Sequence, residues 1–408
     1  MTPGRRRLLH ILDGDFASGY FPDLARFADG ERFDVLFTSL QPLASERAAL
    51  LEVAGVSRYR PLRRGADIGG QDRVRRSADG VVALQRAIGA LRPDVVHAHL
   101  YEPALLGTIA GLLRGVRARV VGRHHSDLVH RAGSPLHVGL DRLATTLSHA
   151  VVANSRFTKE VMVDHEGADP AKVRVVYYGL DTKALRPVPD GEIAILRDAL
   201  GVPPDRFVVV VPARLDREKG HEHLFAALTE LGGGALERMT VLLAGSGPDR
   251  EHFEREIAAR GLTGTVRLLG HRRDINRLYQ LADLTVLPSL SEAFGQVLIE
   301  SLCLGTGVVA TRVGGIPEIV EDGRTGLLVE PADAGDLARA LRASVEQPDR
   351  RGAMAAAGQA RVREVFDSRR TARENEAIYD ELLARAGRAG AFPLYRQNRG
   401  RPPHPKDR

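Results

Sequence analysis

The sequence predicts an α/β protein in which two doubly wound parallel sheets face each other across a deep cleft. Short apolar runs of strand length alternate with helical patterns along the chain, which is typical of parallel sheets covered on both faces. The alternation starts again after a polar, proline-containing segment at residues 185–192. With 408 residues, 43% of them hydrophobic, the chain is long enough to form two such halves.

The first half is expected to contain six strands. Their apolar runs lie at residues 6–12, 32–39, 93–99, 119–122, 150–155 and 173–179. Helical patterns between them include residues 77–91 and 103–114. Because open α/β sheets bind ligands beyond the carboxyl ends of their strands, the loops after these runs are the expected binding positions.

The second half repeats this pattern. Its apolar runs lie at residues 207–215, 239–247, 266–270, 284–289, 307–313 and 326–331. Helices are expected at residues 219–231, 249–260, 274–281, 295–304 and 333–346. Each half of about 180 residues is large enough to be a domain.

Charge and cysteine content exclude several classes of function. The net charge is +6, but residues 388–408 hold six basic residues and one acid, so the folded body is close to neutral and nucleic-acid binding is not expected. This Pro-rich tail is expected to be disordered, either as an inert solubilising tail or in contact with an anionic membrane surface. A single cysteine, Cys303, excludes an intrachain disulfide and fits a cytoplasmic location.

The stretch SEAFGQVLIE places two carboxylates eight positions apart, Glu292 and Glu300. Apolar spacing predicts that a helix begins near Gly295, with Glu292 on the preceding loop and Glu300 within the helix. The free N–H groups at this helix start suit a phosphate or a polar sugar. The alternative is that Glu292 caps the helix and Glu300 lies on a solvated face, and this stretch alone does not decide between the two.

Two cations follow an apolar strand in the stretch PARLDREKG. Arg214 lies at the end of the strand, and Arg214 and Lys219 flank the start of the next helix. An arginine fork and a lysine point charge at such a position can hold a pyrophosphate. The alternative, a pair of solvated surface cations, fits Arg217 better than Arg214.

The stretch AGSGPD places Gly245 and Gly247 after another strand. It is similar to the start of a dinucleotide fingerprint, but Arg250 stands at the third glycine position. We therefore expect a tight turn at the edge of the cleft and no nicotinamide cofactor.

Histidines follow strands of the first half. His124 and His125 end one strand, where an imidazole can hydrogen-bond a polyol or relay a proton. His97 and His99 share one face of another strand, which also suggests a metal site. No carboxylate or cysteine lies at ligand spacing, so we expect no metal ion. Asp13-Gly14-Asp15 follows the first strand and is interpreted as a glycine-containing loop that borders the cleft.

The order of these motifs resembles that of the retaining family 4 glycosyltransferases, which have the GT-B fold of two Rossmann-like domains. The matching stretches are DVVHAH, VVGRHH, VVANS, VVYYGLD, ARLDREKGHEHL, LLAGSGP, LPSLSEAFGQVLIE and GGIPEIVEDGRTGLLVEP. The resemblance implies an acceptor-side domain at residues 1–183 and a nucleotide-sugar domain at 184–367. It also implies that a helix at 368–387 crosses back to the first domain, before the tail.

The resemblance implies a role for each matching residue. Glu292 contacts the donor sugar, Glu300 holds the ribose hydroxyls, and Arg214 and Lys219 stabilise the diphosphate leaving group. His125, or its neighbour His124, faces the reacting sugar. The remaining implied nucleotide-sugar contacts are Phe294, Gly295, Val297, Gly245, Gly247 and His271, and the implied acceptor-side residues are Gly14, Asp15, His124 and Asn154.

The implied reaction moves a sugar from a nucleotide-diphosphate sugar, which is a co-substrate, to a hydroxyl acceptor. No cofactor or metal ion is then required, because preorganised cations stabilise the leaving group. The chain departs from the family at Tyr178, where asparagine is common. The alternatives are a nucleotide-sugar epimerase or phosphorylase of GT-B fold and a non-catalytic scaffold. The nucleotide, the sugar, the acceptor and the oligomeric state are left open.

Overall fold

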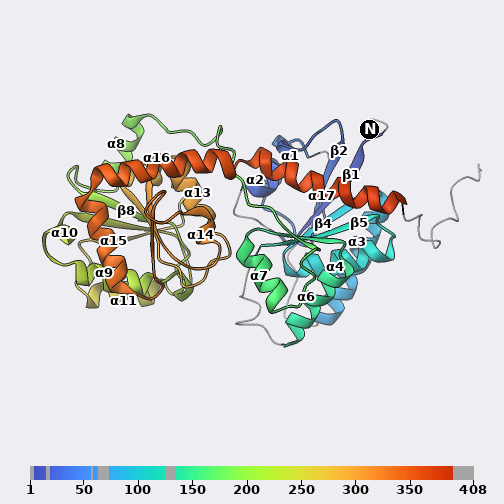
Figure 1. Cartoon of the computed structure of the whole chain (residues 1–408), viewed down its shortest axis with the longest axis horizontal. Helices are drawn as coiled ribbons and strands as arrows, with labels where there is room; N and C mark the ends of the chain where they lie inside the picture. The colour runs from blue at the N-terminus through green and yellow to red at the C-terminus, as the bar shows by residue number, and fades with distance from the viewer. Residues whose placement is uncertain (1–3, 15–18, 57, 63–72, 125–134, 389–408) are drawn as a thin grey trace, which may run out of the picture.

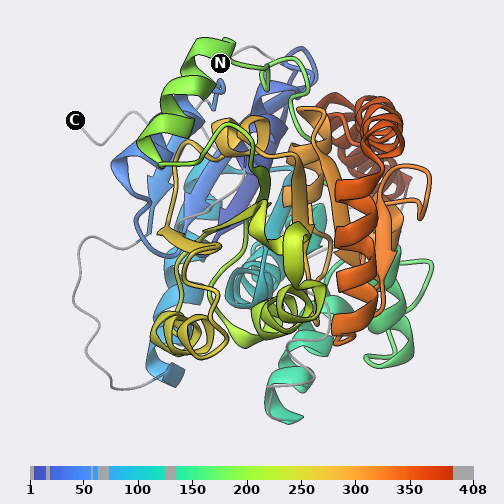
Figure 2. The same cartoon turned by 90° about the vertical axis from the view of Figure 1, so that its left-hand side faces the viewer.

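The computed structural model of the chain describes residues 4–14, 19–56, 58–62, 73–124 and 135–388. It has two lobes that lie side by side, with two long helices running along one side of both (Figure 1). Seen from the side of the second lobe, the first lobe lies behind it (Figure 2). None of the helices in the described ranges is long and apolar enough to span a membrane.

The first lobe contains a seven-stranded parallel sheet with the order β3-β2-β1-β4-β5-β6-β7. Its strands are β1 (Arg6–Leu12), β2 (Phe33–Ser39), β3 (Arg58–Pro61), β4 (Val95–His99), β5 (Ala118–Arg123), β6 (Ala150–Ala153) and β7 (Val173–Val175). Its helices are α1 (Tyr20–Arg26), α2 (Ser45–Val53), α3 (Arg73–Leu91), α4 (Tyr101–Leu113), α6 (Pro135–Leu147) and α7 (Arg156–Asp164). The strand order reverses direction between β1 and β4, which places a crevice at their carboxyl ends.

The second lobe contains a six-stranded parallel sheet with the order β10-β9-β8-β11-β12-β13. Its strands are β8 (Phe207–Val211), β9 (Met239–Ala244), β10 (Val266–Gly270), β11 (Leu284–Leu287), β12 (Gly307–Thr311) and β13 (Leu327–Val329). Its helices are α8 (Asp190–Ala199), the short 3-10 helix η1 (Arg217–Lys219), α9 (His221–Leu231), α10 (Gly233–Glu237), α11 (Arg250–Ala259), α12 (Ile275–Leu281), α13 (Gln296–Cys303), α14 (Ile316–Ile319), α15 (Ala334–Glu346) and α16 (Pro348–Val365). The equivalent crevice lies between β8 and β11.

Burial on both faces of the sheets explains the uninterrupted apolar runs. In β8, Val209 and Val211 pack into one hydrophobic cluster, while Val208 and Val210 pack into another on the opposite face. All four valines are fully buried. Because successive side chains of a strand point to opposite faces, only a sheet covered by helices on both sides buries all of them. The predicted fold, two doubly wound α/β halves, is confirmed.

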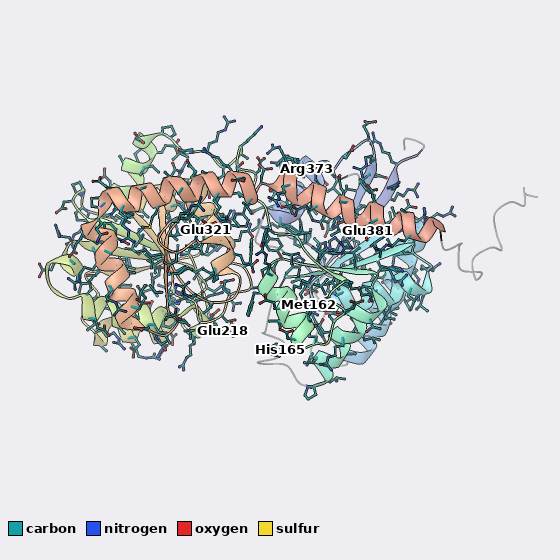
Figure 3. All side chains as sticks on the ribbon, in the orientation of Figure 1. Met162, His165, Glu218, Glu321, Arg373 and Glu381 are labelled. Atoms are coloured by element: carbon teal, nitrogen blue, oxygen red, sulfur yellow. The ribbon has the colours of Figure 1, made fainter. Side chains whose placement is uncertain are left out.

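The last helix, α17 (Ser368–Arg388), leaves the second lobe and covers the first (Figure 1). Its Ile378, Tyr379, Leu382 and Leu383 belong to the same hydrophobic cluster as β1 and β2. Glu381 of this helix accepts hydrogen bonds of 2.9 and 3.0 Å from Arg174 in β7 of the first lobe (Figure 3).

The chain passes between the lobes at two points that are hydrogen-bonded to each other. The backbone N–H of Leu180 donates to the carbonyl of Phe366 (2.8 Å), and that of Ser368 donates to the carbonyl of Leu180 (3.1 Å). These bonds hold the two connections side by side.

Two expectations about strands were wrong. The sequence analysis missed β3, because RYRP has only one aromatic residue and a proline, which a sheet tolerates at an edge. The run at residues 173–179 forms a strand only as far as Val175. Beyond it, Tyr177 and Tyr178 turn toward the second lobe, where both rings pack against Phe294.

Candidate active site

Three loops of the second lobe converge at the carboxyl ends of β8, β11 and β12. The backbone N–H of Leu290, after β11, donates to the carbonyl of Glu218, after β8 (2.7 Å). The N–H of Gly315, after β12, donates to the carbonyl of Glu292 (3.2 Å). The loops are therefore fixed to one another at the position where open α/β sheets bind ligands.

Lys219 and Glu292 form the central ion pair of this site. The Nζ of Lys219 lies 2.7 Å from Oε2 of Glu292, and each side chain is 19% exposed. One comes from the loop after β8 and the other from the loop after β11, so the fold joins two residues that are 73 positions apart. The sequence predicted both for one ligand, and the structure brings them into direct contact.

Arg214 lies at the same edge of the sheet but has a different partner. Its Nε donates to Oδ2 of Asp216 (2.8 Å), and its side chain is 74% exposed. Asp216 itself is buried and holds the guanidinium near the end of β8. An exposed arginine that is anchored in this way lies where it can contact an anionic ligand.

Glu300 lies within α13, as predicted, and reaches the end of α12. The hydroxyl of Tyr279 donates to its Oε2 at 3.1 Å. Burial raises the pKa of the Glu300 carboxyl to about 7, and the hydrogen bond from Tyr279 opposes this shift. The carboxyl group therefore changes charge near neutral pH, which the sequence did not indicate.

The segment between the two glutamates forms the start of α13. Gly295 is the N-cap with a φ of 96°, a left-handed conformation that favours glycine. The Phe294 side chain is buried, and its ring stacks on that of Tyr177 from the first lobe with 5.9 Å between centroids. Val297 packs against the core of the second lobe. The structure thus gives these residues packing roles in addition to the predicted contact with a sugar nucleotide.

Gly245 and Gly247 pack directly against the loop that carries Arg214. A Cβ atom at either position would lie 1.9 or 2.2 Å from the backbone carbonyl oxygen of Ala213 or Leu215. Both positions therefore require glycine for the close approach of two backbones. His271 is exposed after β10, an edge strand two strand spacings, roughly 10 Å, from β8.

Four histidines gather on the neighbouring strands β1, β4 and β5 of the first lobe, with His99 at the carboxyl end of β4 and His124 directly after β5. His10 and His99 share a hydrogen bond of 2.8 Å between Nδ1 and Nε2, and His99 Nδ1 lies 2.9 Å from His124 Nε2. His97 Nδ1 lies 2.7 Å from the hydroxyl of Tyr379 in α17. The sequence predicted that His97 and His99 share a face, and the structure adds His10.

Burial keeps His10, His97 and His99 uncharged. Desolvation lowers the pKa of His10 to about 3 and holds the pKa values of His97 and His99 well below the usual range. A neutral imidazole has one N–H donor and one acceptor nitrogen, so these rings can form a chain of hydrogen bonds.

Ring nitrogens of His10, His97 and His99 that could bind a metal ion all lie within 4.8 Å of one another. A nitrogen of each ring already takes part in a hydrogen bond, to another ring of the cluster or to Tyr379. Among the described residues, Nε2 of His97 is buried without a hydrogen-bond partner. The expectation that no metal ion is needed stays a prediction.

His124 connects the histidine cluster to the seam between the lobes. Its Nδ1 contacts the hydroxyl of Tyr178, whose ring lies edge-on to that of Phe294 at 5.6 Å. Asn154 is buried and donates to the backbone carbonyl of His124 at 3.3 Å. The departure from the family pattern at Tyr178 therefore lies at the predicted acceptor side.

Of the other predicted site residues in the first lobe, the structure describes only Gly14. Gly14 follows β1, and a Cβ atom there would lie 3.5 Å from Cβ of Gln41. His125 and Asp15 lie outside the described residues. Their predicted roles stay predictions.

Arg123 forms a buried ion cluster directly before His124. Its guanidinium contacts Asp141 of α6 and lies 2.8 Å from Oε2 of Glu166, which follows α7. All three residues are almost fully buried. This cluster fixes the end of β5, and hence the backbone of His124, against two helices. The sequence analysis missed it because the two acids are 18 and 43 positions from the arginine.

Comparisons with known proteins agree with this geometry. The model of a family described as "Glycosyl transferases group 1" matches residues 192–361, and that of "Glycosyltransferase Family 4" matches residues 20–184. An alpha-maltose-1-phosphate synthase from Mycolicibacterium smegmatis is 33% identical over 71% of this chain and 79% of that protein. The chain belongs to the family 4 glycosyltransferases.

Further comparisons place this glycosyltransferase among related proteins. It is 32% identical to a D-inositol 3-phosphate glycosyltransferase 2 from Catenulispora acidiphila, over 63% of this chain and 64% of that protein. Its fold is similar to that of Anabaena HepE solved with UDP and glucose, with a TM-score of 0.78 and 24% identity, over 92% of this chain and 100% of that one. The similarity to HepE supports the GT-B fold.

The glycosyltransferase has a contact between its lobes that the sequence analysis did not identify. Oε2 and Oε1 of Glu318, in α14, accept hydrogen bonds of 2.9 and 3.0 Å from the backbone N–H groups of Arg156 and Phe157. These groups begin α7 in the other lobe. The hydroxyl of Tyr177 also donates to Glu318 at 2.8 Å. A carboxylate from one lobe thus caps a helix of the other, where the helix dipole favours negative charge.

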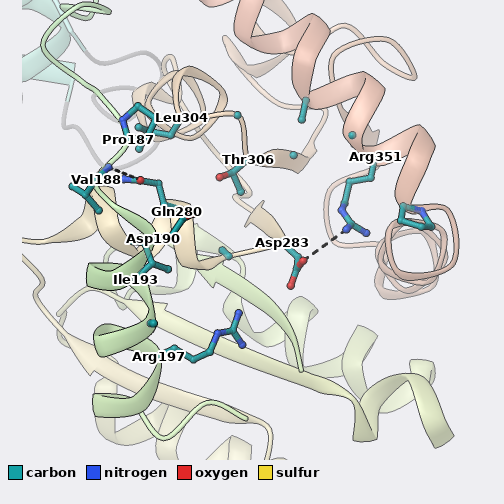
Figure 4. Close-up of a pocket in the computed structure, with 17 residues that line it drawn as sticks. Pro187, Val188, Asp190, Ile193, Arg197, Gln280, Asp283, Leu304, Thr306 and Arg351 are labelled. Carbon is teal, nitrogen blue, oxygen red and sulfur yellow. Dashed lines mark hydrogen bonds and ion pairs between the residues drawn. The ribbon is translucent and has the colours of Figure 1, made fainter. Parts of the chain in front are cut away.

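A cavity of about 650 Å³ lies elsewhere in the second lobe (Figure 4). Asp283 and Thr306, which precede β11 and β12, line it together with Arg351 of α16. It therefore lies at the amino ends of these strands, at the opposite edge of the sheet from Lys219 and Glu292. Because ligands of open α/β sheets bind at the carboxyl ends, this cavity is not the active site of the glycosyltransferase.

Proposed function

We propose that the protein is a retaining glycosyltransferase that moves a sugar from a nucleotide-diphosphate sugar to a hydroxyl acceptor. The contact between Lys219 and Glu292 carries this proposal. A cation and an acid from separate loops meet at the switch point of the sheet, where the cation suits a diphosphate and the acid suits sugar hydroxyls. Glu300, one and a half turns into α13 by sequence spacing, is then assigned to the ribose.

In this proposal the second lobe, within residues 184–367, binds the donor and the first, within residues 1–183, binds the acceptor. The bond between the anomeric carbon and the departing phosphate oxygen breaks, and a bond from the acceptor oxygen to that carbon forms. The acceptor proton passes to an oxygen of the leaving diphosphate. Lys219 and Arg214 stabilise the negative charge that develops on the diphosphate, which cations do best in a closed and dry cleft.

Closure of the lobes around the donor supports this chemistry. Glu318 and the stacked rings of Tyr177 and Phe294 join the lobes beside the site. The proposed reaction uses no metal ion or cofactor. A cytoplasmic location, and contact of the tail with a membrane surface, stay part of the proposal.

Thermal shift with UDP-, GDP-, ADP- and dTDP-sugars tests the donor. We expect one of them to raise the melting temperature, since a ligand that binds only the folded state stabilises it. Product formation is then measured with that donor, beginning with D-inositol 3-phosphate and a sugar 1-phosphate because two relatives carry names of such compounds. The anomeric configuration of the product, from NMR coupling constants, tests retention. Absence of binding by all four sugars would overturn the proposal.

A further inference from the structure

Tyr279 is the partner that the structure gives to the Glu300 carboxyl group. The two residues lie on neighbouring helices, α12 and α13, and the tyrosine hydroxyl donates to Oε2 at 3.1 Å. The pKa of Glu300 responds to two influences, burial and this hydrogen bond, with no cation among them. Among the described residues, the titratable groups whose pKa the charge of Glu300 raises are Tyr279 and Cys303.

The position of the Tyr279 hydroxyl is fixed by its surroundings. The side chain is fully buried in the hydrophobic cluster that also contains Val208, Leu242 and Leu281. Its backbone carbonyl accepts a hydrogen bond of 2.6 Å from the hydroxyl of Thr306, at the start of β12. Core packing therefore holds the ring, and a bond to another element holds the backbone, so the hydroxyl cannot follow the carboxyl group if the latter rotates.

A fixed donor determines how the carboxyl group of Glu300 is oriented. The terminal torsion of a glutamate is broad, so an unrestrained carboxylate presents either oxygen over a wide range of angles. With Oε2 bonded to Tyr279, Oε1 is the oxygen left to accept from a ligand. A hydrogen bond to the charged form also favours that form, which opposes the effect of burial.

Together these contacts assign Tyr279 a role in donor binding. We propose that Tyr279 is a positioning residue, which orients and holds ionised the Glu300 carboxylate that binds the ribose hydroxyls of the donor. This inference rests on the proposed function and extends it to a residue that does not itself touch the ligand.

The Tyr279→Phe variant tests this role, because it removes the hydroxyl and keeps the ring in the core. The probe is the nucleoside diphosphate whose sugar stabilises the wild-type protein, and its Kd is measured by calorimetry. We expect Kd to rise about tenfold at pH 7, as for the loss of a hydrogen bond to a charged group. The deficit should shrink as the pH is raised, since the variant carboxyl has the higher pKa and ionises later. The kcat at saturating donor should change little.

A double-mutant cycle separates positioning from packing. If Tyr279 acts through Glu300, adding Tyr279→Phe to Glu300→Ala, which removes the acceptor oxygen, should weaken binding no further. Tyr59→Phe is the matched control, since it removes a hydroxyl that is hydrogen-bonded to Ser39 in the other lobe. Its Kd should equal that of the wild type at every pH.

Several outcomes would overturn the inference. These are an unchanged Kd in Tyr279→Phe, a deficit that does not depend on pH, or additive effects in the double variant. Should Tyr279→Phe fail to fold, Thr306→Val, which removes the bond to the Tyr279 carbonyl, should raise Kd by about threefold, and an unchanged value counts against the proposal. A wild-type protein that binds no nucleoside diphosphate would instead overturn the proposed function.

Discussion

The two crevices of the molecule are built from opposite kinds of side chain. In the first lobe, the ends of β1 and β4 carry neutral, buried histidines that hydrogen-bond to one another. In the second, the ends of β8 and β11 carry the Lys219–Glu292 ion pair and the anchored Arg214. Similar sheet topologies thus carry a buried, uncharged cluster in one lobe and a charged site in the other. Topology decides where a ligand binds, and the residues after the strands decide its chemistry.

Lowering the pH should produce the largest difference between the two lobes, because it should destabilise the first lobe more than the second. Burial lowers the pKa of His10 from 6.5 to about 3, so between these values the unfolded chain binds a proton that the folded one does not. Stability is therefore lost as the pH falls through 6.5, by about 2 kcal/mol at pH 5 for His10 alone. His97 and His99 act in the same direction.

The second lobe should resist the same change in pH. His221 is buried with a pKa of about 4, which also destabilises the fold in acid. Glu300, with a pKa of about 7, has the opposite sign, because the folded state holds its proton more tightly than the unfolded state does. The effects of these two pKa shifts on the stability of the second lobe therefore largely offset each other. Pulse-labelled hydrogen exchange after incubation at pH 7 and pH 5 checks this, and equal loss of protection in both sheets would contradict it.

Removing the central cation of the charged crevice should have the next largest effect, a loss of turnover. Lys219→Ala should lower kcat by about 10²–10³, as for loss of one preorganised group that stabilises transition-state charge. The matched control is Arg217→Ala, which removes an exposed cation from the same loop. Turnover equal to that of the control would show that Lys219 does not stabilise the leaving group.

Neutralising the contact between the lobes should change how the two crevices meet. In Glu318→Gln the side chain keeps only one acceptor oxygen, so it no longer offers one oxygen to each of the two N–H groups at the start of α7. We expect kcat/KM to fall about tenfold. Small-angle scattering should show a larger radius of gyration. The control is Glu330→Gln, a surface acid paired with Arg312. An unchanged radius would argue against a role of Glu318 in closure.

The smallest effect is expected from the uncharged crevice. Tyr178→Phe removes the hydroxyl that contacts His124, and should raise the acceptor KM by about threefold while the donor KM stays constant. Tyr101→Phe, whose hydroxyl bonds the backbone carbonyl of His137, is the control. A change confined to the donor KM would reverse the assignment of the two crevices.

The sequence predicts what depends on local pattern. Apolar runs identify most strands because both faces of each sheet are buried, and loops after the strands then contain Lys219 and Glu292. Contacts that depend on how helices pack were missed. Nothing in the spacing shows that Tyr279 reaches Glu300, that Glu318 reaches the other lobe, or that His10 joins His97. The first two pairings are decided by the angle at which two elements meet, and the third by the register of β1 against β4. A periodicity of 2 or 3.6 encodes neither.

Helix α17 makes folding of the first lobe depend on a segment that is synthesised after the second lobe. Its Ile378, Tyr379, Leu382 and Leu383 complete a core whose other members begin at Leu8. A nascent chain therefore cannot complete the core of the first lobe until α17 has been synthesised, although domains generally fold in the order of synthesis. The second lobe has its own core and can form earlier. The first lobe therefore keeps part of its apolar surface uncovered until α17 has been synthesised.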